Sequence, residues 1–132
     1  MSTRATGSFE VKLTPQTPVH ADAGVGRMSI DKVFSGDLQG SSQGEMLAAM
    51  TAVKGSAGYV AIERVSGTLH GKSGSFMLQH TGVMDRGTPQ LDVNVVPDSG
   101  TGELTGLAGR LAIDIVDGKH LYTFDYTLPA TS

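Results

Sequence analysis

Hydrophobic and polar residues alternate with a period of two over most of the chain. In residues 6–14, for example, Phe9, Val11 and Leu13 occupy every second position. Such alternation is typical of β-strands that have one buried face, and no long stretch shows a helical period. The pattern predicts strands at residues 6–14, 27–37, 42–52, 58–70, 73–84, 90–97, 109–116 and 119–128.

Two segments interrupt this pattern. Residues 15–26 contain two prolines and several small residues, which predicts a loop. Residues 44–52 include Glu45–Met50, a run of good helix formers, so a short helix is the alternative to the strand predicted there.

A Gly-x-Leu-x-Gly motif occurs three times, at residues 36–40, 67–71 and 102–106. The spacings of 31 and 35 residues suit a repeated hairpin unit. A sheet of many strands with internal glycines favours closure, because closure removes exposed strand edges. The sequence therefore predicts an all-β protein, a closed eight-stranded antiparallel β-barrel formed by residues 1–132 as one domain.

Turn signals predict how neighbouring strands pair. Asp117-Gly118 is a strong two-residue turn signal. Pairing outward from it gives Ile115 with His120, Ile113 with Tyr122, Leu111 with Phe124 and, on the other face, an Arg110–Asp125 ion pair. The agreement of apolar and charged pairs supports this register.

A second turn, predicted at Gly71-Lys72, places Glu63 opposite His80 on an otherwise apolar inner face. Burying a carboxylate and an imidazole costs several kcal/mol unless they pair or meet water or a ligand. We therefore predict Glu63 and His80 as catalytic residues that act as acid and base. A satisfied buried ion pair is the alternative.

Other residues share this inward orientation. Aligning the first repeat with the second turns Lys32, Glu45 and Phe34 inward, while the last strand and the predicted hairpins add aromatic side chains. The predicted ligand-binding residues are Lys32, Glu45, Tyr122, Tyr126, Phe34 and Phe76, with core packing as the alternative for the aromatic ones. The opposite, outer face keeps Val60, Ile62, Met77, Val83, Met46 and Met50. This is more apolar than a monomer usually exposes, so we expect a homo-oligomer, a dimer or a trimer.

Composition narrows the class of function. The net charge of −3 and the lack of a basic run argue against a nucleic-acid partner. No segment of about 18 apolar residues suggests a membrane span, and no signal peptide is recognisable. The chain has no cysteine, and its four histidines lack metal-ligand spacing. We expect a cytoplasmic protein without a cofactor, a metal or a membrane partner.

Several motifs resemble those of a known family. They include Arg27–Lys32, Lys54–Arg64, Pro97–Leu104 and Asp117–His120. Over nearly its whole length the chain resembles a bacterial domain family of unknown function, which is grouped with the allene oxide cyclase and dirigent-type barrels. The resemblance implies an allene oxide cyclase-like barrel with a central cavity, in which relatives fold an apolar, reactive substrate.

The leading hypothesis is a small-molecule-binding barrel, an isomerase or cyclase that acts on an apolar substrate in its cavity. The residues do not separate this hypothesis from two others. The protein is alternatively a non-catalytic carrier or sensor of an apolar metabolite, or an oligomeric assembly module.

Overall fold

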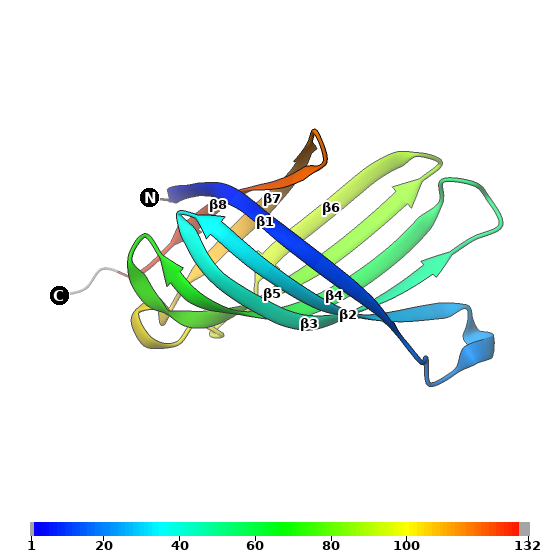
Figure 1. Cartoon of the computed structure of the whole chain (residues 1–132), viewed down its shortest axis with the longest axis horizontal. Helices are drawn as coiled ribbons and strands as arrows, with labels where there is room; N and C mark the ends of the chain where they lie inside the picture. The colour runs from blue at the N-terminus through cyan, green and yellow to red at the C-terminus, as the bar shows by residue number, and fades with distance from the viewer. Residues whose placement is uncertain (1, 130–132) are drawn as a thin grey trace.

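Eight antiparallel strands form a closed barrel in the computed structural model, which describes residues 2–129 (Figure 1). Each strand pairs with the next along the chain, and β8 pairs with β1 to close the sheet. The strands are β1 (Thr3–Gln16), β2 (Val25–Gly36), β3 (Leu38–Met50), β4 (Ala57–Leu69), β5 (Lys72–Asp85), β6 (Thr88–Val95), β7 (Ala108–Val116) and β8 (Lys119–Thr127). Two short 3₁₀ turns, η1 (Ala21–Ala23) and η2 (Gly102–Leu104), lie in the loops. The predicted fold class is confirmed.

The predicted strands are all present, with differences at their ends. Residues 44–50 continue β3, so the helical alternative for this segment is wrong. The first strand extends to Gln16 and the second begins at Val25, which shortens the predicted loop. Gln16 pairs with Arg27 and Val25 pairs with Ala49, so pairing with the neighbouring strands extends both strands beyond the ends that the local loop signals predict.

The hairpin turns determine how the strands pair. Asp117 and Gly118 have φ values of 51° and 79°, as a two-residue turn of this hand requires, and the predicted β7–β8 register is confirmed. The β4–β5 turn consists of His70 and Gly71, one residue earlier than predicted, with φ values of 47° and 79°. The observed β4–β5 register therefore differs from the predicted register by two residues.

This difference changes the partners of two predicted catalytic residues. Glu63 lies opposite Leu78, and His80 lies opposite Ala61. A shift of two residues keeps every side chain on its own face of the sheet. Glu63 and His80 therefore still share the inner face, as diagonal rather than direct neighbours.

The predicted Arg110–Asp125 ion pair is wrong, although the two residues are opposite each other. Asp125 is flanked on its other side by Arg4 of β1, whose guanidinium donates to it at 2.9 Å. Arg110 instead pairs with Asp92 of β6. In a closed barrel every strand has two neighbours, so a charged side chain has possible partners on both sides. Asp125 pairs across the closing β8–β1 strands, and Arg110 pairs with a residue of β6.

One end of the barrel is filled with side chains. The rings of Phe76 and Phe124 stack with centroids 5.8 Å apart. The loop between β6 and β7 covers this end with Leu104 and Leu107, which are buried. We call this half of the barrel the packed end. The other half, which is bounded by the β1–β2, β3–β4, β5–β6 and β7–β8 connections, is the open end.

Candidate ligand-binding cavity

A cavity of about 490 Å³ occupies the open end of the barrel. All eight strands contribute side chains to its wall, most of them apolar. Its rim is solvent-exposed: Ile115 is 67% and Leu13 is 45% exposed. A concave apolar cavity of this size, with few polar groups, is typical of small-molecule sites.

Small side chains leave room for this cavity. The inner positions of β3 and β4 in this half of the barrel include Ala48, Ala57 and Ala61. On β5, Gly82 faces Tyr59 across the strand pair, and a Cβ at Gly82 would lie 2.1 Å from the Tyr59 ring. The glycine thus allows the tyrosine ring to lie flat against the cavity wall.

The floor of the cavity is an ionic cluster built by four adjacent strands. The carboxylate of Glu63, on β4, accepts three hydrogen bonds. Lys32 Nζ of β2 donates to Oε2 at 2.8 Å, and Ser42 Oγ of β3 donates to Oε1 at 2.7 Å. His80 Nε2 of β5 lies 2.5 Å from Oε2. All four residues are buried, and Glu63 is 0% exposed.

The cluster keeps Glu63 ionised. Burial by itself raises the pKa of the Glu63 carboxyl, because it disfavours the charged form. The hydrogen bond from His80 and the charge of Lys32 outweigh this effect and lower the pKa from 4.5 to about 2. The Lys32 ammonium also lies 4.8 Å from the centre of the Phe9 ring, a favourable cation–π distance.

Two members of the cluster reach the cavity and two do not. Lys32 and His80 line it, whereas Glu63 and Ser42 lie behind them. His80 uses Nε2 to contact Glu63, and its Nδ1 has no hydrogen-bond partner within residues 2–129. A ligand in the cavity would therefore meet Lys32 Nζ and His80 Nδ1, while Glu63 acts through both.

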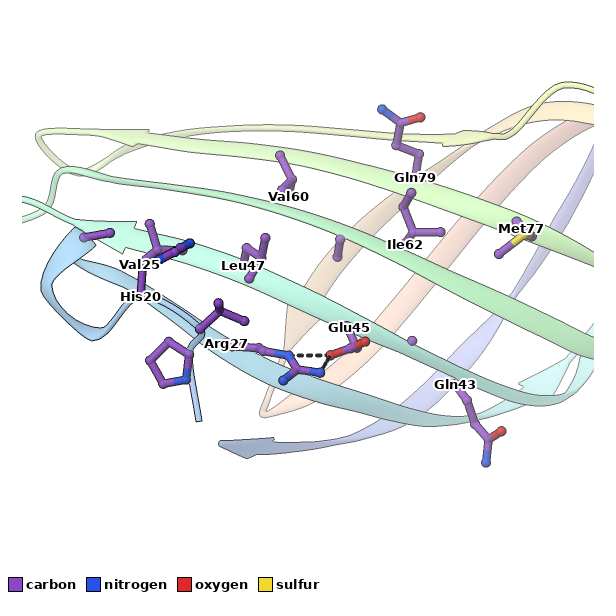
Figure 2. Close-up of a pocket in the computed structure, with 15 residues that line it drawn as sticks. His20, Val25, Arg27, Gln43, Glu45, Leu47, Val60, Ile62, Met77 and Gln79 are labelled. Carbon is purple, nitrogen blue, oxygen red and sulfur yellow. Dashed lines mark hydrogen bonds and ion pairs between the residues drawn. The ribbon is translucent and has the colours of Figure 1, made fainter. Parts of the chain in front are cut away.

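The structure corrects the predicted position of Glu45. Lys32 pairs with Ser42, so the even-numbered residues of β3 face inward and Glu45 faces outward. There it accepts a hydrogen bond from Arg27 Nε at 2.7 Å (Figure 2). For the same reason Met46 and Met50, which were expected outside, line the cavity.

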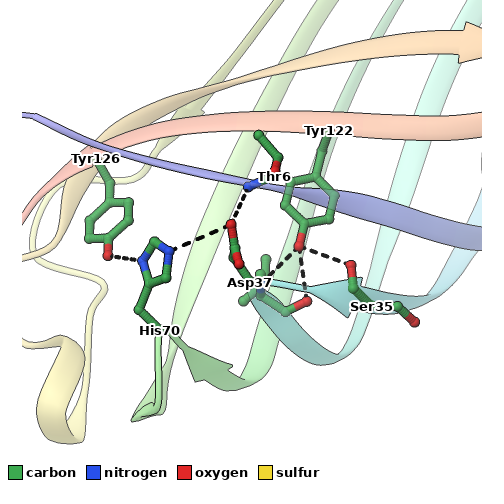
Figure 3. Close-up of polar contacts among 7 residues, drawn as sticks. Thr6, Ser35, Asp37, His70, Tyr122 and Tyr126 are labelled. Carbon is green, nitrogen blue, oxygen red and sulfur yellow. Dashed lines mark hydrogen bonds and ion pairs between the residues drawn. The ribbon is translucent and has the colours of Figure 1, made fainter.

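The remaining predicted ligand contacts lie in the packed end, and none lines the cavity. Phe34 and Phe76 are buried in the core. The Tyr122 hydroxyl accepts the Leu38 backbone N–H at 2.8 Å and lies 3.0 Å from the Ser35 carbonyl (Figure 3). The Tyr126 hydroxyl contacts His70 Nδ1 at 2.5 Å. Both hydroxyl groups therefore link strands of the packed end: Tyr122 connects β8 with β2 and β3, and Tyr126 connects β8 with the β4–β5 turn.

Sequence reasoning missed three polar residues of the site. Tyr59 and His120 line the cavity, and Ser42 supports Glu63. Tyr59 and His120 alternate in step with Glu63 and Tyr122, which are predicted to face inward, and this alternation is the available signal. No sequence signal indicates Ser42, because a single serine in a strand does not reveal which side chain it will bond.

A second depression, of about 930 Å³, lies on the outer surface of the barrel (Figure 2). It extends from the β1–β2 loop across the outer faces of β3, β4 and β5. Val60 and Ile62 in its wall are 52% and 49% exposed. The predicted exposure of these two residues is confirmed.

The fold and the site define a closed eight-stranded barrel with a cavity at one end and a buried ionic floor. The model of a family described as protein of unknown function (DUF3224) matches residues 5–126, and the chain belongs to that family. It is similar to a DUF3224 protein of unknown function from Shewanella oneidensis MR-1, whose crystal structure is known. The two share 54% identity with a TM-score of 0.94, over 99% of this chain and 100% of the other.

These comparisons confirm the resemblance to a family of unknown function, and the link to allene oxide cyclase-type barrels stays a prediction. No curated protein matches the chain.

Within residues 2–129, no helix has the length and hydropathy to cross a membrane. Nor do three or more His, Cys, Asp or Glu residues in this range gather as they would to hold a metal ion.

Proposed function

We propose that the cavity binds an apolar small molecule and that Lys32 and His80 promote a proton-transfer isomerisation or cyclisation of it. One observation carries the proposal: the floor of an apolar cavity presents a lysine and a histidine that share a buried carboxylate. Buried titratable groups at the base of a cavity are typical of sites that bind or react.

The contacts assign a role to each residue. His80 Nδ1 accepts a proton from a carbon next to a carbonyl group, and Glu63 holds the ring through Nε2 and stabilises the imidazolium that forms. The electron pair of the broken C–H bond moves to the carbonyl oxygen, where the Lys32 ammonium donates a hydrogen bond to the developing charge. In a substrate with a C=C double bond next to the deprotonated carbon, the enolate extends to the far end of that double bond. His80 then returns the proton to the far carbon while the C=O bond re-forms and the double bond moves next to it, which completes an isomerisation.

The resemblance to allene oxide cyclase-type and dirigent-type barrels supports this proposal, because such proteins fold an apolar substrate inside the barrel. Positioning a flexible substrate contributes several kcal/mol to catalysis by itself. The apolar wall of the open end, with Phe9, Ile30 and Ile113, is suited to that role.

A thermal-shift screen of apolar ketones, carboxylic acids and aromatic compounds tests binding. A ligand at 100 times its Kd stabilises a protein by about 2.7 kcal/mol, which is readily measured. Carbonyl compounds that bind are then incubated with the protein in D₂O, and mass spectrometry measures deuterium incorporation next to the carbonyl. We expect the wild type to catalyse exchange and His80→Gln to lose it.

His120→Gln is the matched control, since His120 also lines the cavity but has no carboxylate partner within residues 2–129. It should retain exchange. Equal exchange rates in wild type and His80→Gln would refute the role of His80.

A non-catalytic carrier or sensor is the second candidate. It is favoured by the fact that, in residues 2–129, every polar side-chain atom that is fully shut off from solvent and from the cavity already has a hydrogen-bond partner. In that case compounds bind to wild type and His80→Gln alike, and neither exchanges deuterium.

We further propose that the chain forms a homo-oligomer through the outer faces of β4 and β5. The exposed Val60 and Ile62 support this contact surface. Ile62→Lys should lower the mass measured by sedimentation without changing ligand binding in the cavity. An unchanged mass would remove this surface from the interface and, with it, support for an assembly module.

A further inference from the structure

The cavity wall has an unequal distribution of charge. The chain has 13 aspartate and glutamate residues, yet none is among the residues that line the cavity. The titratable side chains of the wall are Lys32, His80, His120 and Tyr59. A protein with a net charge of −3 thus encloses a cavity whose lining has basic groups and no acidic one.

The hydrogen bonds of the cluster leave donors on the cavity side. Both oxygens of Glu63 are occupied, by Ser42 on one and by Lys32 and His80 on the other. An ammonium group has three N–H donors, and Lys32 uses one of them for Glu63. The Lys32 donors that remain and His80 Nδ1 have no protein partner within residues 2–129, so they are available to a ligand.

We infer that the ligand is an apolar molecule with one anionic head group, a carboxylate or an ionised enol, that binds Lys32 Nζ and His80 Nδ1. Its apolar part lies along the wall towards the exposed rim. This inference rests on the proposed function, to which it adds the charge and orientation of the ligand. An anionic head group reproduces the state that follows proton transfer, in which His80 Nδ1 carries the proton and the substrate is an enolate. Glu63 cannot repel the head group by direct contact, because Lys32 and His80 lie between it and the cavity.

Charge balance couples this binding to a proton. Lys32 and Glu63 cancel each other, so an anion in the cavity is balanced when His80 becomes protonated. Nδ1 then donates to the head group while Nε2 continues to donate to Glu63. The titratable groups around His80 are Glu63 on β4, Lys32 on β2 and, along the same wall, Tyr59 on β4 and His120 on β8. We therefore expect binding of the anion to be accompanied by proton uptake.

The test uses three probes with the same ten-carbon chain: decanoate, decanamide and 1-decanol. Isothermal titration calorimetry measures their affinities, and titrations in phosphate and in Tris give the number of protons taken up. A hydrogen bond to a charged group contributes about 1.5–3 kcal/mol, so decanoate should bind about 10-fold or more tightly than the neutral probes. His80→Gln should abolish the proton uptake, whereas His120→Gln, the matched control, should retain it.

Lys32→Met should reduce decanoate affinity about 10-fold without weakening 1-decanol, but it leaves Glu63 buried without its cation. The double variant Lys32→Met/Glu63→Gln removes both charges together and keeps the test valid if the single variant does not fold. It should show a reduced preference for decanoate over decanamide, because His80 is then the remaining partner of the head group.

Neutral probes that bind the wild type as tightly as decanoate would overturn this inference and leave the proposed function intact. So would an undiminished preference for decanoate in the double variant. If none of the three probes binds, and no compound of the thermal-shift screen does, the proposed function fails together with the inference.

Discussion

Replacement of Glu63 by glutamine tests whether the ionic cluster stabilises the barrel as well as forming the cavity floor. The side chain keeps its shape in Glu63→Gln but loses its charge, while Lys32 stays buried beside it. The folded-state pKa of Glu63, about 2, lies below its ordinary value of 4.5, so the ionised carboxyl stabilises the folded state.

The magnitude follows from that difference. A fall in pKa from 4.5 to about 2, at about 1.4 kcal/mol per pH unit, corresponds to about 3 kcal/mol at neutral pH. Removing one partner of a buried ion pair costs about 3–5 kcal/mol in other proteins, which agrees. This stabilisation is complete above pH 4.5 and is lost as the pH falls towards 2, because folded Glu63 then becomes protonated. About half of it should remain near pH 3.

Urea denaturation followed by circular dichroism measures the free energy of unfolding at each pH. The chain has no tryptophan, so tyrosine fluorescence is the second probe. We expect Glu63→Gln to be about 3 kcal/mol less stable than wild type at pH 7, with an unchanged m-value, and the gap to shrink towards pH 3. Lys32→Met/Glu63→Gln should recover part of the loss, since no unpaired charge stays buried.

Asp125→Asn is the control, because Asp125 forms an ion pair with Arg4 on the exposed outer surface. Its effect should be small. The reasoning is refuted if Glu63→Gln costs less than about 1 kcal/mol at pH 7, or if its cost is the same at pH 3 and pH 7.

Two further predictions concern the packed end and the strand glycines. Tyr122→Phe should lower the free energy of unfolding by about 1–3 kcal/mol in urea titrations, because the buried Leu38 N–H loses its acceptor. Gly7→Ala should lower the melting temperature strongly, since its Cβ would lie 2.1 Å from the backbone oxygen of Ser35, whereas Gly26→Ala meets nothing closer than 3.8 Å and should be tolerated. Equal melting temperatures for the two glycine variants would contradict this account.

Much of the barrel follows from alternation and turn chemistry alone. The β7–β8 pairing could be predicted because Asp117-Gly118 is an unambiguous turn and apolar pairs on the inner face support it. The β4–β5 pairing differed by two residues because His70-Gly71 and Gly71-Lys72 both contain a glycine suited to the turn. Since side chains repeat every two residues, this error left Glu63 and His80 on the correct face.

The division of the barrel into a packed end and an open end could not be predicted in the same way. Tyr122 and Tyr126 face inward as expected, but which inward residues share a level depends on the stagger of all eight strands. The cluster partner Ser42 depends on the same stagger, because it reaches Glu63 only through the β3–β4 pairing. The pairing of two strands in one hairpin does not determine the stagger of all eight strands, so it does not predict which inward residues meet.

The position of Glu45 shows that the length of one turn determines which side chains of the following strand line the cavity. The first and second repeats align in sequence, but β2 and β3 are joined by Asp37 alone, whereas His70 and Gly71 join β4 and β5. One residue fewer in the turn reverses the face of the whole following strand. Glu45 consequently lies outside with Arg27, and Met46 lies inside. With a two-residue turn at Asp37, the Glu45 carboxylate would face the cavity and oppose an anionic ligand. The short turn therefore keeps the cavity wall free of acidic groups as well as setting the register.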